Sequence, residues 1–156
     1  MVGLPAGSAE LRGLRILVVE DEFLVALELE SMVKELGGDV IGPLGSLDQA
    51  VAIAREEALD LALLDVNVGG RLITPVADAL AARGIPFAFC TGYDAAGLPD
   101  RHAAAPILTK PCQLRELRST LLSSVRSRTS RPPARTGAKP ATGKGRAGRA
   151  ARFPRN

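Results

Sequence analysis

The 156-residue chain is 46% hydrophobic and 24% charged, and it contains four Phe, one Tyr, no Trp, two Cys and one His. No apolar run approaches the roughly 20 residues that a membrane-spanning helix needs, so a transmembrane protein is excluded and no membrane partner is expected. The N-terminus also lacks the basic start and apolar stretch of a secretion signal, so we expect a cytoplasmic protein with reduced cysteines.

Charge divides the chain into two unlike parts. Residues 1–125 contain all 17 acidic residues and 10 of the 20 basic ones, a formal charge of −7, whereas residues 126–156 contain the other 10 basic residues and no acid. The only large apolar residue of the basic part is Phe153, so this part cannot bury enough surface to offset the entropy of ordering. We therefore expect a leader over 1–12, one folded domain over 13–125 and a disordered basic tail over 126–156.

Within the domain, apolar runs alternate with helical patterns. The apolar runs are continuous, which is typical of strands covered on both faces, as in a parallel sheet. In chain order the sequence predicts a strand at 16–19, a helix over 25–36, a weaker strand at 39–44, a helix over 47–57, strands at 61–64 and 86–90 with a helix over 74–84 between them, a short helix within 94–105, a strand at 106–108 and a helix over 114–125.

Local signals mark several of the helix ends. The first helix should stop at Gly37-Gly38, and Ser46 with Gln49 three residues later is typical of a capping box. Thr74-Pro75 fits a capping residue followed by proline in the first helical position. Strands separated by helical crossovers imply an open, doubly wound α/β fold, whose ligand site lies beyond the carboxyl ends of the strands.

Charged and polar residues follow the predicted strands at that edge. Glu20 and Asp21 follow the first strand, Asp65 ends the third, Thr91 follows the fourth and Lys110 follows the fifth. Three crowded carboxylates raise one another's proton affinity or bind a hard cation, of which Mg²⁺ is the natural candidate. With a lysine and a hydroxyl nearby, the chemistry is phosphoryl transfer to an aspartate. Singly, each residue could instead be a helix cap, a turn or a solvated charge.

The same residues resemble the receiver (CheY-like) domain of response regulators in two-component signalling. The resemblance covers about residues 13–125. It rests on four segments in a fixed order: Val18-Val19-Glu20-Asp21-Glu22, Leu63-Leu64-Asp65-Val66-Asn67, Phe89-Cys90-Thr91-Gly92-Tyr93 and Leu108-Thr109-Lys110-Pro111. It implies a flavodoxin-like, five-stranded parallel sheet of order 2-1-3-4-5.

The resemblance also implies roles for individual residues. Asp65 would accept a phosphoryl group from a sensor histidine kinase, Thr91 and Lys110 would contact its oxygens, and the bond before Pro111 would be cis. Phosphorylation would then switch a surface that binds a downstream protein, so the module is not a turnover enzyme. The resemblance assigns Mg²⁺ to Glu20, Asp21, Asp65 and the backbone carbonyl of Asn67.

Residues 86–93 are more closely similar to a subclass marked by a Phe-Ala-Thr-Gly-Tyr motif, with Cys90 in place of Ala. Members are commonly stand-alone receivers that serve kinases of the HWE type. Ile107 occupies the position of the usual switch aromatic, so Tyr93, on the loop after Thr91, is the candidate switch residue, or else an exposed loop aromatic. Cys112 stands where Phe is usual; with Cys90 it could form a redox pair or be a small buried thiol.

Two other functions compete with this interpretation. A phosphatase of the haloacid dehalogenase type also uses a strand-end Asp and Mg²⁺, but it needs a second Asp where this chain has Asn67. The basic tail could instead bind nucleic acid weakly and without sequence specificity, or simply be solvated. His102 has no partner visible in the sequence and is expected to be solvated.

Overall fold

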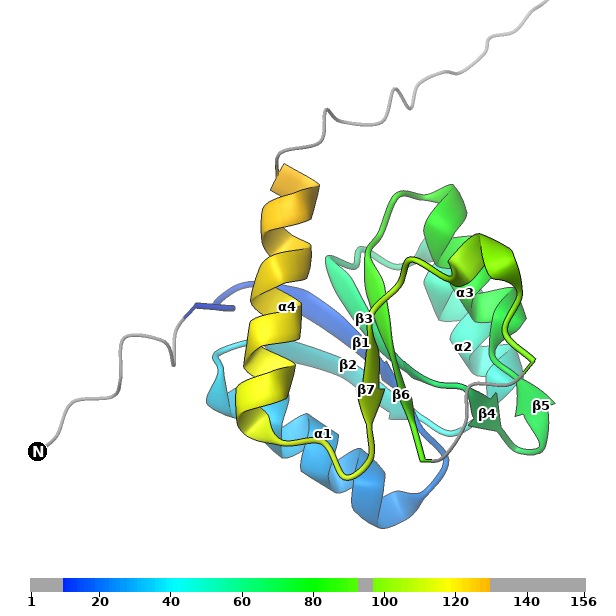
Figure 1. The fold of residues 1–156 in the computed structure, drawn as a ribbon, viewed down its shortest axis with the longest axis horizontal. Coiled ribbons are helices and arrows are strands. Elements are labelled where there is room, and N and C mark those ends of the chain that lie inside the picture. The colour runs from blue at the N-terminus through cyan, green and yellow to red at the C-terminus, as the bar shows by residue number, and fades with distance from the viewer. Residues whose placement is uncertain (1–9, 93–96, 130–156) are drawn as a thin grey trace, which may run out of the picture.

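A computed structural model describes residues 10–92 and 97–129 of the chain (Figure 1). It contains helices α1 to α4, strands β1 to β7 and a short 3-10 helix, η2. Their order is β1 (Arg15–Val19), α1 (Phe23–Glu35), β2 (Asp39–Leu44), α2 (Leu47–Glu56), β3 (Leu61–Asp65), β4 (Asn67–Val68), β5 (Arg71–Leu72), α3 (Thr74–Ala82), β6 (Phe87–Thr91), η2 (Asp100–His102), β7 (Ile107–Thr109) and α4 (Leu114–Thr129).

Five of the strands form one parallel sheet in the order β2-β1-β3-β6-β7. This is the order 2-1-3-4-5 once the strands of the main sheet are numbered alone, so the predicted α/β fold and strand order are confirmed. Helices α1 and α4 cover one face of the sheet and α2 and α3 cover the other (Figure 1). No helix in the described ranges is both long enough and apolar enough to cross a bilayer.

Burial on both faces explains the continuous apolar runs. Along β1, Leu17 and Val19 pack in the core beneath α2 and α3, whereas Ile16 and Val18 pack in the core beneath α1 and α4. All five residues of β3, Leu61–Asp65, are buried, as expected of a central strand. Successive strand residues point to opposite faces, so both faces must be apolar when both are covered.

The predicted helix ends are correct in part. Helix α1 ends at Glu35 before Gly37, which has φ of 95°, and the Ser46 hydroxyl accepts a hydrogen bond from the Gln49 N–H at 3.2 Å. At α3, however, Ile73 is the N-cap, and its side chain makes no capping hydrogen bond. Thr74 therefore already lies within the helix, and the prediction that it is the cap is wrong.

Two local features differ from the sequence-based expectation. Strands β4 and β5 form a hairpin directly after β3 that was not predicted; Gly69 and Gly70 have φ of 60° and 80°, the left-handed values that a tight hairpin turn requires. Between 97 and 105 the chain forms only η2 rather than an α-helix, in a segment that contains Pro99 and ends against Pro106. The remaining part of that expected helix, 93–96, lies outside the described residues.

His102 is buried, so the expectation of a solvated side chain is wrong. It is 6% exposed, and its Nε2 donates a hydrogen bond to Oδ1 of Asp78 on α3 at 2.7 Å. Its ring also meets Phe87 and Phe89 edge-on, with centroids 5.5 and 6.5 Å apart. Arg101 holds the same carboxylate through two hydrogen bonds of 2.9 Å and thereby lowers the pKa of Asp78 to about 2. These contacts fasten η2 to α3 and β6.

At the chain ends, the expected leader and tail are described only in part. Leu11 is fully buried in the core beneath α1 and α4, and Glu10 forms an ion pair of 2.7 Å with Arg118 on α4. Helix α4 continues through Thr129. Residues 130–156, which make up most of the expected basic tail, lie outside the described residues.

Candidate functional site

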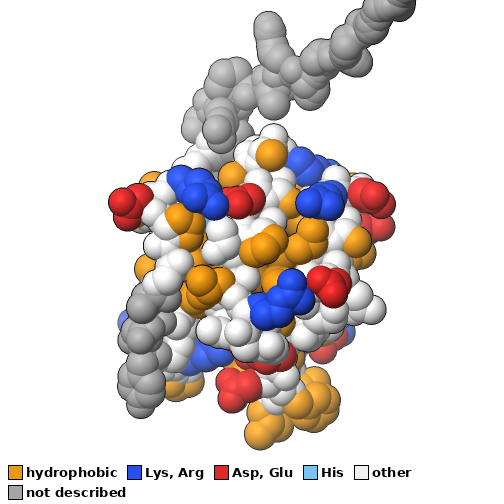
Figure 2. Space-filling view, turned by 90° about the vertical axis from the view of Figure 1, so that its right-hand side faces the viewer, with side chains coloured by type: hydrophobic (Ala, Val, Ile, Leu, Met, Phe, Trp, Pro, Cys, Tyr) orange, Lys and Arg blue, Asp and Glu red, His pale blue; other side chains and the backbone are white. Residues whose placement is uncertain are grey.

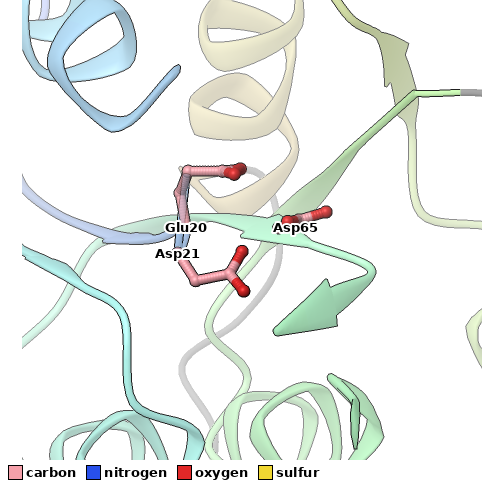
Figure 3. A group of neighbouring side chains, drawn as sticks. All are labelled: Glu20, Asp21 and Asp65. Carbon is pink, nitrogen blue, oxygen red and sulfur yellow. The ribbon is translucent and has the colours of Figure 1, made fainter. Parts of the chain in front are cut away.

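The structure brings three acidic residues together at the carboxyl edge of the sheet. Glu20 and Asp21 follow β1, and Asp65 ends β3, the strand that pairs directly with β1. One carboxylate oxygen from each lies within 4.8 Å of the others. Figure 3 shows the side chains of Glu20 and Asp21 extending from the end of β1 toward Asp65. The parallel register thus produces the acidic cluster predicted from the sequence.

Lys110 enters this cluster from the end of β7. Its Nζ lies 2.9 Å from Oε1 of Glu20, 3.3 Å from Oδ2 of Asp65 and 3.6 Å from Oε1 of Glu22. The peptide bond between Lys110 and Pro111 is cis, as the resemblance implied. A single ammonium therefore faces three carboxylates, one of which, Glu20, is fully buried.

Thr91 reaches the same edge at the end of β6. It is 8% exposed, its register partner on β7 is Thr109, and its carbonyl accepts a hydrogen bond of 2.8 Å from the Lys110 N–H. Since β6 lies between β3 and β7 in the sheet, Thr91 is placed between Asp65 and Lys110. All five residues singled out at the predicted strand ends therefore lie at one edge.

Burial and charge shift the proton affinities of this cluster. Burial raises the pKa of Glu20, and the nearby charge of Asp65 raises it further, although a hydrogen bond from Lys110 opposes the shift. Burial also opposes the charged form of Lys110, but the hydrogen bonds and charges of Glu20 and Asp65 together outweigh burial, so the pKa of Lys110 is raised. The lysine is thus held as a cation by its acidic neighbours.

The acidic oxygens fit a hard divalent cation. Oε1 of Glu20 is buried and lacks an aligned hydrogen bond, although the Lys110 ammonium lies 2.9 Å away. Asp21 is exposed, and Asp65 is buried. An unsatisfied buried oxygen beside two further carboxylates is the all-oxygen donor set that Mg²⁺ prefers.

The β4–β5 hairpin completes the edge of the cluster. Asn67 begins β4, two residues after Asp65, and its N–H lies 3.5 Å from Oδ1 of Asp65. At the hairpin turn, the Gly69 N–H donates a hydrogen bond of 2.8 Å to Oδ2 of Asp21. Sequence reasoning missed this contact. The Gly69-Gly70 dipeptide was the available signal, since paired glycines are typical of a tight hairpin turn.

The sequence suggests Tyr93 as the candidate switch residue. Tyr93 lies outside the described residues. Ile107 on β7 is 49% exposed and offers no aromatic ring at the position of the usual switch residue. A switch role for Tyr93 therefore stays a prediction.

The two cysteines are in contact. Their sulfur atoms lie 3.5 Å apart, with Cys90 buried on β6 and Cys112 partly exposed before α4. The hydrogen bond between them raises the pKa of the Cys90 thiol, as does burial, and lowers the pKa of the Cys112 thiol. The thiols are therefore close enough to react with each other, and a redox role for the pair stays a prediction.

No protein-family model matches the chain. Among curated proteins, the phyllosphere-induced regulator PhyR of Methylorubrum extorquens is 36% identical over 102 residues, which is 63% of this chain and 38% of PhyR. The chain thus spans well under half of PhyR.

Solved structures give more complete matches. The solution structure of SdrG from Sphingomonas melonis Fr1 is 36% identical with a TM-score of 0.62, and the match covers 74% of this chain and 96% of SdrG. The signal receiver domain of a modulated diguanylate cyclase from Desulfovibrio desulfuricans is 25% identical with a TM-score of 0.65, covering 75% of this chain and 97% of that domain. Fold, site geometry and these matches agree, and the chain belongs to the receiver (CheY-like) domain family of response regulators.

Proposed function

We propose that this receiver accepts a phosphoryl group on Asp65 from a sensor histidine kinase and thereby switches a protein-binding surface. The observation that carries the proposal is the position of the Asp65 carboxylate, which ends β3 only 3.3 Å from the Lys110 ammonium and beside Glu20 and Asp21. In the transfer, an Asp65 oxygen attacks phosphorus while the bond from phosphorus to the kinase's histidine nitrogen breaks. An acyl phosphate forms, and the histidine is released.

The acidic cluster supports a requirement for Mg²⁺. The groups that would hold the cation are the carboxylates of Glu20, Asp21 and Asp65 and the backbone carbonyl of Asn67. A bound Mg²⁺ supplies positive charge toward the phosphoryl oxygens. Lys110, whose ammonium lies 3.3 Å from Asp65, would supply a second positive charge, and Thr91, at the end of the neighbouring strand β6, would donate a hydrogen bond to the same oxygens.

The site favours a phosphoryl acceptor over a phosphatase. In a haloacid dehalogenase type of enzyme, a second acid two residues after the nucleophile carries protons to and from the substrate. Here that position is Asn67, the exposed first residue of β4, whose amide side chain cannot transfer a proton in this way. The protein therefore acts through what it binds rather than through turnover of an external substrate.

An exposed apolar surface next to the site supports a protein as phosphodonor. Phe23 and Leu24 at the start of α1 are each 72% exposed, and Leu27 one turn later is 44% exposed. Only Glu22 separates Asp21 from Phe23. Figure 2 shows hydrophobic side chains protruding beside acidic ones at the lower end of the molecule, where α1 begins in Figure 1. We propose that a kinase of the HWE type binds over these residues.

We propose that phosphorylation changes the conformation of the segment after β6, and that a downstream protein recognises this change. Phosphorylation adds nearly two negative charges beside Thr91, which would draw its hydroxyl inward and move the chain that follows it. The similar protein SdrG has been solved in a BeF3-activated conformation. The surface proposed to respond is formed by residues 97–105 and β7, which a downstream protein would bind.

Incubation with acetyl phosphate and Mg²⁺ tests the proposal without a partner. Intact-mass spectrometry should detect a gain of about 80 Da in the wild type, and none in Asp65→Asn or when Mg²⁺ is removed with EDTA. Asp60→Asn is the matched control. Asp60 lies just before β3, outside the acidic cluster, and its carboxylate accepts a hydrogen bond from the Arg15 N–H. A full gain in Asp65→Asn would contradict the assignment.

A further inference from the structure

The two cysteines are close in sequence to Thr91 and Lys110, the residues proposed to contact the phosphoryl group. Cys90 directly precedes Thr91 on β6, and Cys112 follows Lys110 by two residues. Although 22 positions apart in sequence, their sulfur atoms are 3.5 Å apart. A disulfide has a sulfur–sulfur distance of about 2.05 Å, so a small movement would allow the bond to form.

The surroundings of the two cysteines determine which of them can move. Cys90 is 1% exposed and is held in β6, between β3 and β7, with register partners Asp65 and Leu108. Cys112 is partly exposed and lies in the connection between β7 and α4, outside regular secondary structure. An oxidant would therefore reach Cys112 first, and the Cys112 connection would move toward Cys90.

We propose that Cys90 and Cys112 form a modification site, at which hydrogen peroxide produces an intramolecular disulfide that slows phosphorylation of Asp65. The first part, formation of the disulfide, stands on the geometry of the two thiols. The second part, the effect on phosphorylation, rests on the function proposed above.

The oxidation balances with one peroxide. The Cys112 sulfur attacks one peroxide oxygen, so a sulfur–oxygen bond forms, the oxygen–oxygen bond breaks, and the departing hydroxide takes up the thiol proton as water. The Cys90 sulfur then attacks the sulfenic sulfur of Cys112. A sulfur–sulfur bond forms, the sulfur–oxygen bond breaks, and the second water leaves with the Cys90 proton. Two thiols are oxidised and one peroxide is reduced to two waters.

The disulfide acts on the site through Lys110. The Lys110 ammonium is held 2.9 Å from Glu20 and 3.3 Å from Asp65, and only the cis-linked Pro111 separates Lys110 from Cys112. Pulling Cys112 toward β6 displaces this backbone and the ammonium with it. Displacements of about 1 Å near reacting atoms cost large factors in rate, so we expect phosphorylation to slow by about threefold or more.

The test treats the full-length protein with hydrogen peroxide and counts the remaining free thiols by alkylation and intact mass. The wild type should lose both thiols in an intramolecular bond that dithiothreitol reverses, whereas Cys90→Ala and Cys112→Ala should form no such bond. Cys112→Ala is at a partly exposed position, so it keeps the comparison valid if the buried variant does not fold. Two free thiols after treatment, or oxidation of Cys112 alone, would overturn the proposed site.

Phosphorylation by acetyl phosphate is then timed for the oxidised, reduced and re-reduced protein. We expect the oxidised wild type to be slower, the re-reduced protein to recover, and both Ala variants to be insensitive to peroxide. A disulfide that forms without changing the rate would overturn the regulatory part. If neither the reduced nor the oxidised protein is phosphorylated, the proposed function fails, while the thiol count still decides whether the disulfide forms.

Discussion

Replacing Lys110 with Met tests the electrostatic balance of the site. The variant keeps a similar side-chain length but removes the only ammonium that contacts the buried Glu20 carboxylate among the described residues. Removing one partner of a buried ion pair leaves an uncompensated charge, which is strongly destabilising. Lys110 also contacts Asp65, so the variant leaves two carboxylates without the ammonium that they share.

The size of the effect is limited by proton uptake. A buried carboxylate can become neutral by binding a proton. For Glu20, with an ordinary pKa of 4.5, protonation costs about 1.4 kcal/mol for each pH unit above that value, or roughly 3.4 kcal/mol at pH 7. Because the Lys110 side chain is 15% exposed, solvent already shares part of its role. We expect Lys110→Met to lower the free energy of unfolding by about 2 to 3 kcal/mol at pH 7.

The pH dependence identifies the cause. In the variant the pKa of Glu20 in the folded state lies further above its unfolded value, so protonation stabilises the folded state as the pH falls. The deficit relative to the wild type should therefore shrink by up to about 1.4 kcal/mol per pH unit and nearly vanish around pH 4.5. Urea unfolding in EDTA at several pH values measures this directly.

A matched control separates burial from simple loss of charge. Lys34 also lies 2.9 Å from a carboxylate, that of Glu30, but its side chain is 61% exposed. Lys34→Met should change stability by no more than about 0.5 kcal/mol, without the pH signature. If Lys110→Met behaves like this control, or if its deficit grows as the pH falls, the electrostatic reasoning is wrong.

Three further predictions concern the metal site, η2 and the partner surface. Asp21→Asn should raise the melting temperature of the metal-free protein by relieving repulsion but abolish its stabilisation by Mg²⁺, and an unchanged Mg²⁺ titration would contradict the site. His102→Ala should lower the free energy of unfolding by about 2 to 3 kcal/mol in chemical denaturation, because it removes a buried ring and the hydrogen bond to Asp78. A loss of less than about 0.5 kcal/mol would show that His102 does not hold η2 against α3. The double variant Phe23→Ser, Leu24→Ser should slow phosphorylation by the kinase about tenfold or more but leave the rate with acetyl phosphate unchanged. Equal slowing in both assays would mean that these residues affect the phosphoryl-transfer site itself rather than binding of the kinase.

The positions of the acidic residues could be predicted because they depend on topology alone. Continuous apolar runs separated by helices require a parallel sheet with both faces covered, and all carboxyl ends of such strands meet at one edge. Glu20, Asp65 and Lys110 belong to three different strand ends, so their convergence follows without knowledge of any side-chain rotamer. The positions of the site residues were therefore predicted more completely than local features such as the β4–β5 hairpin and η2.

The features that the sequence did not predict depend on tertiary contacts. His102 appeared solvated because its partner Asp78 is 24 positions away, and the Phe87 and Phe89 rings that cover it lie on a strand whose neighbours are set by the whole sheet. The same contacts stabilise η2 where the sequence suggested an α-helix. The contact between Cys90 and Cys112 arises in the same way, from the pairing of β6 with β7.

The central claim is that Asp65 itself receives the phosphoryl group. Borohydride reduction tests it directly, because it converts the acyl phosphate of an aspartate to homoserine, which peptide mass mapping locates in the sequence. After incubation with acetyl phosphate and Mg²⁺, the account predicts homoserine at position 65 and at no other acidic position. Homoserine at Asp21, the one-carbon-longer 5-hydroxynorvaline at Glu20, or an unmodified peptide at position 65 in protein that has gained a phosphoryl group, would contradict it.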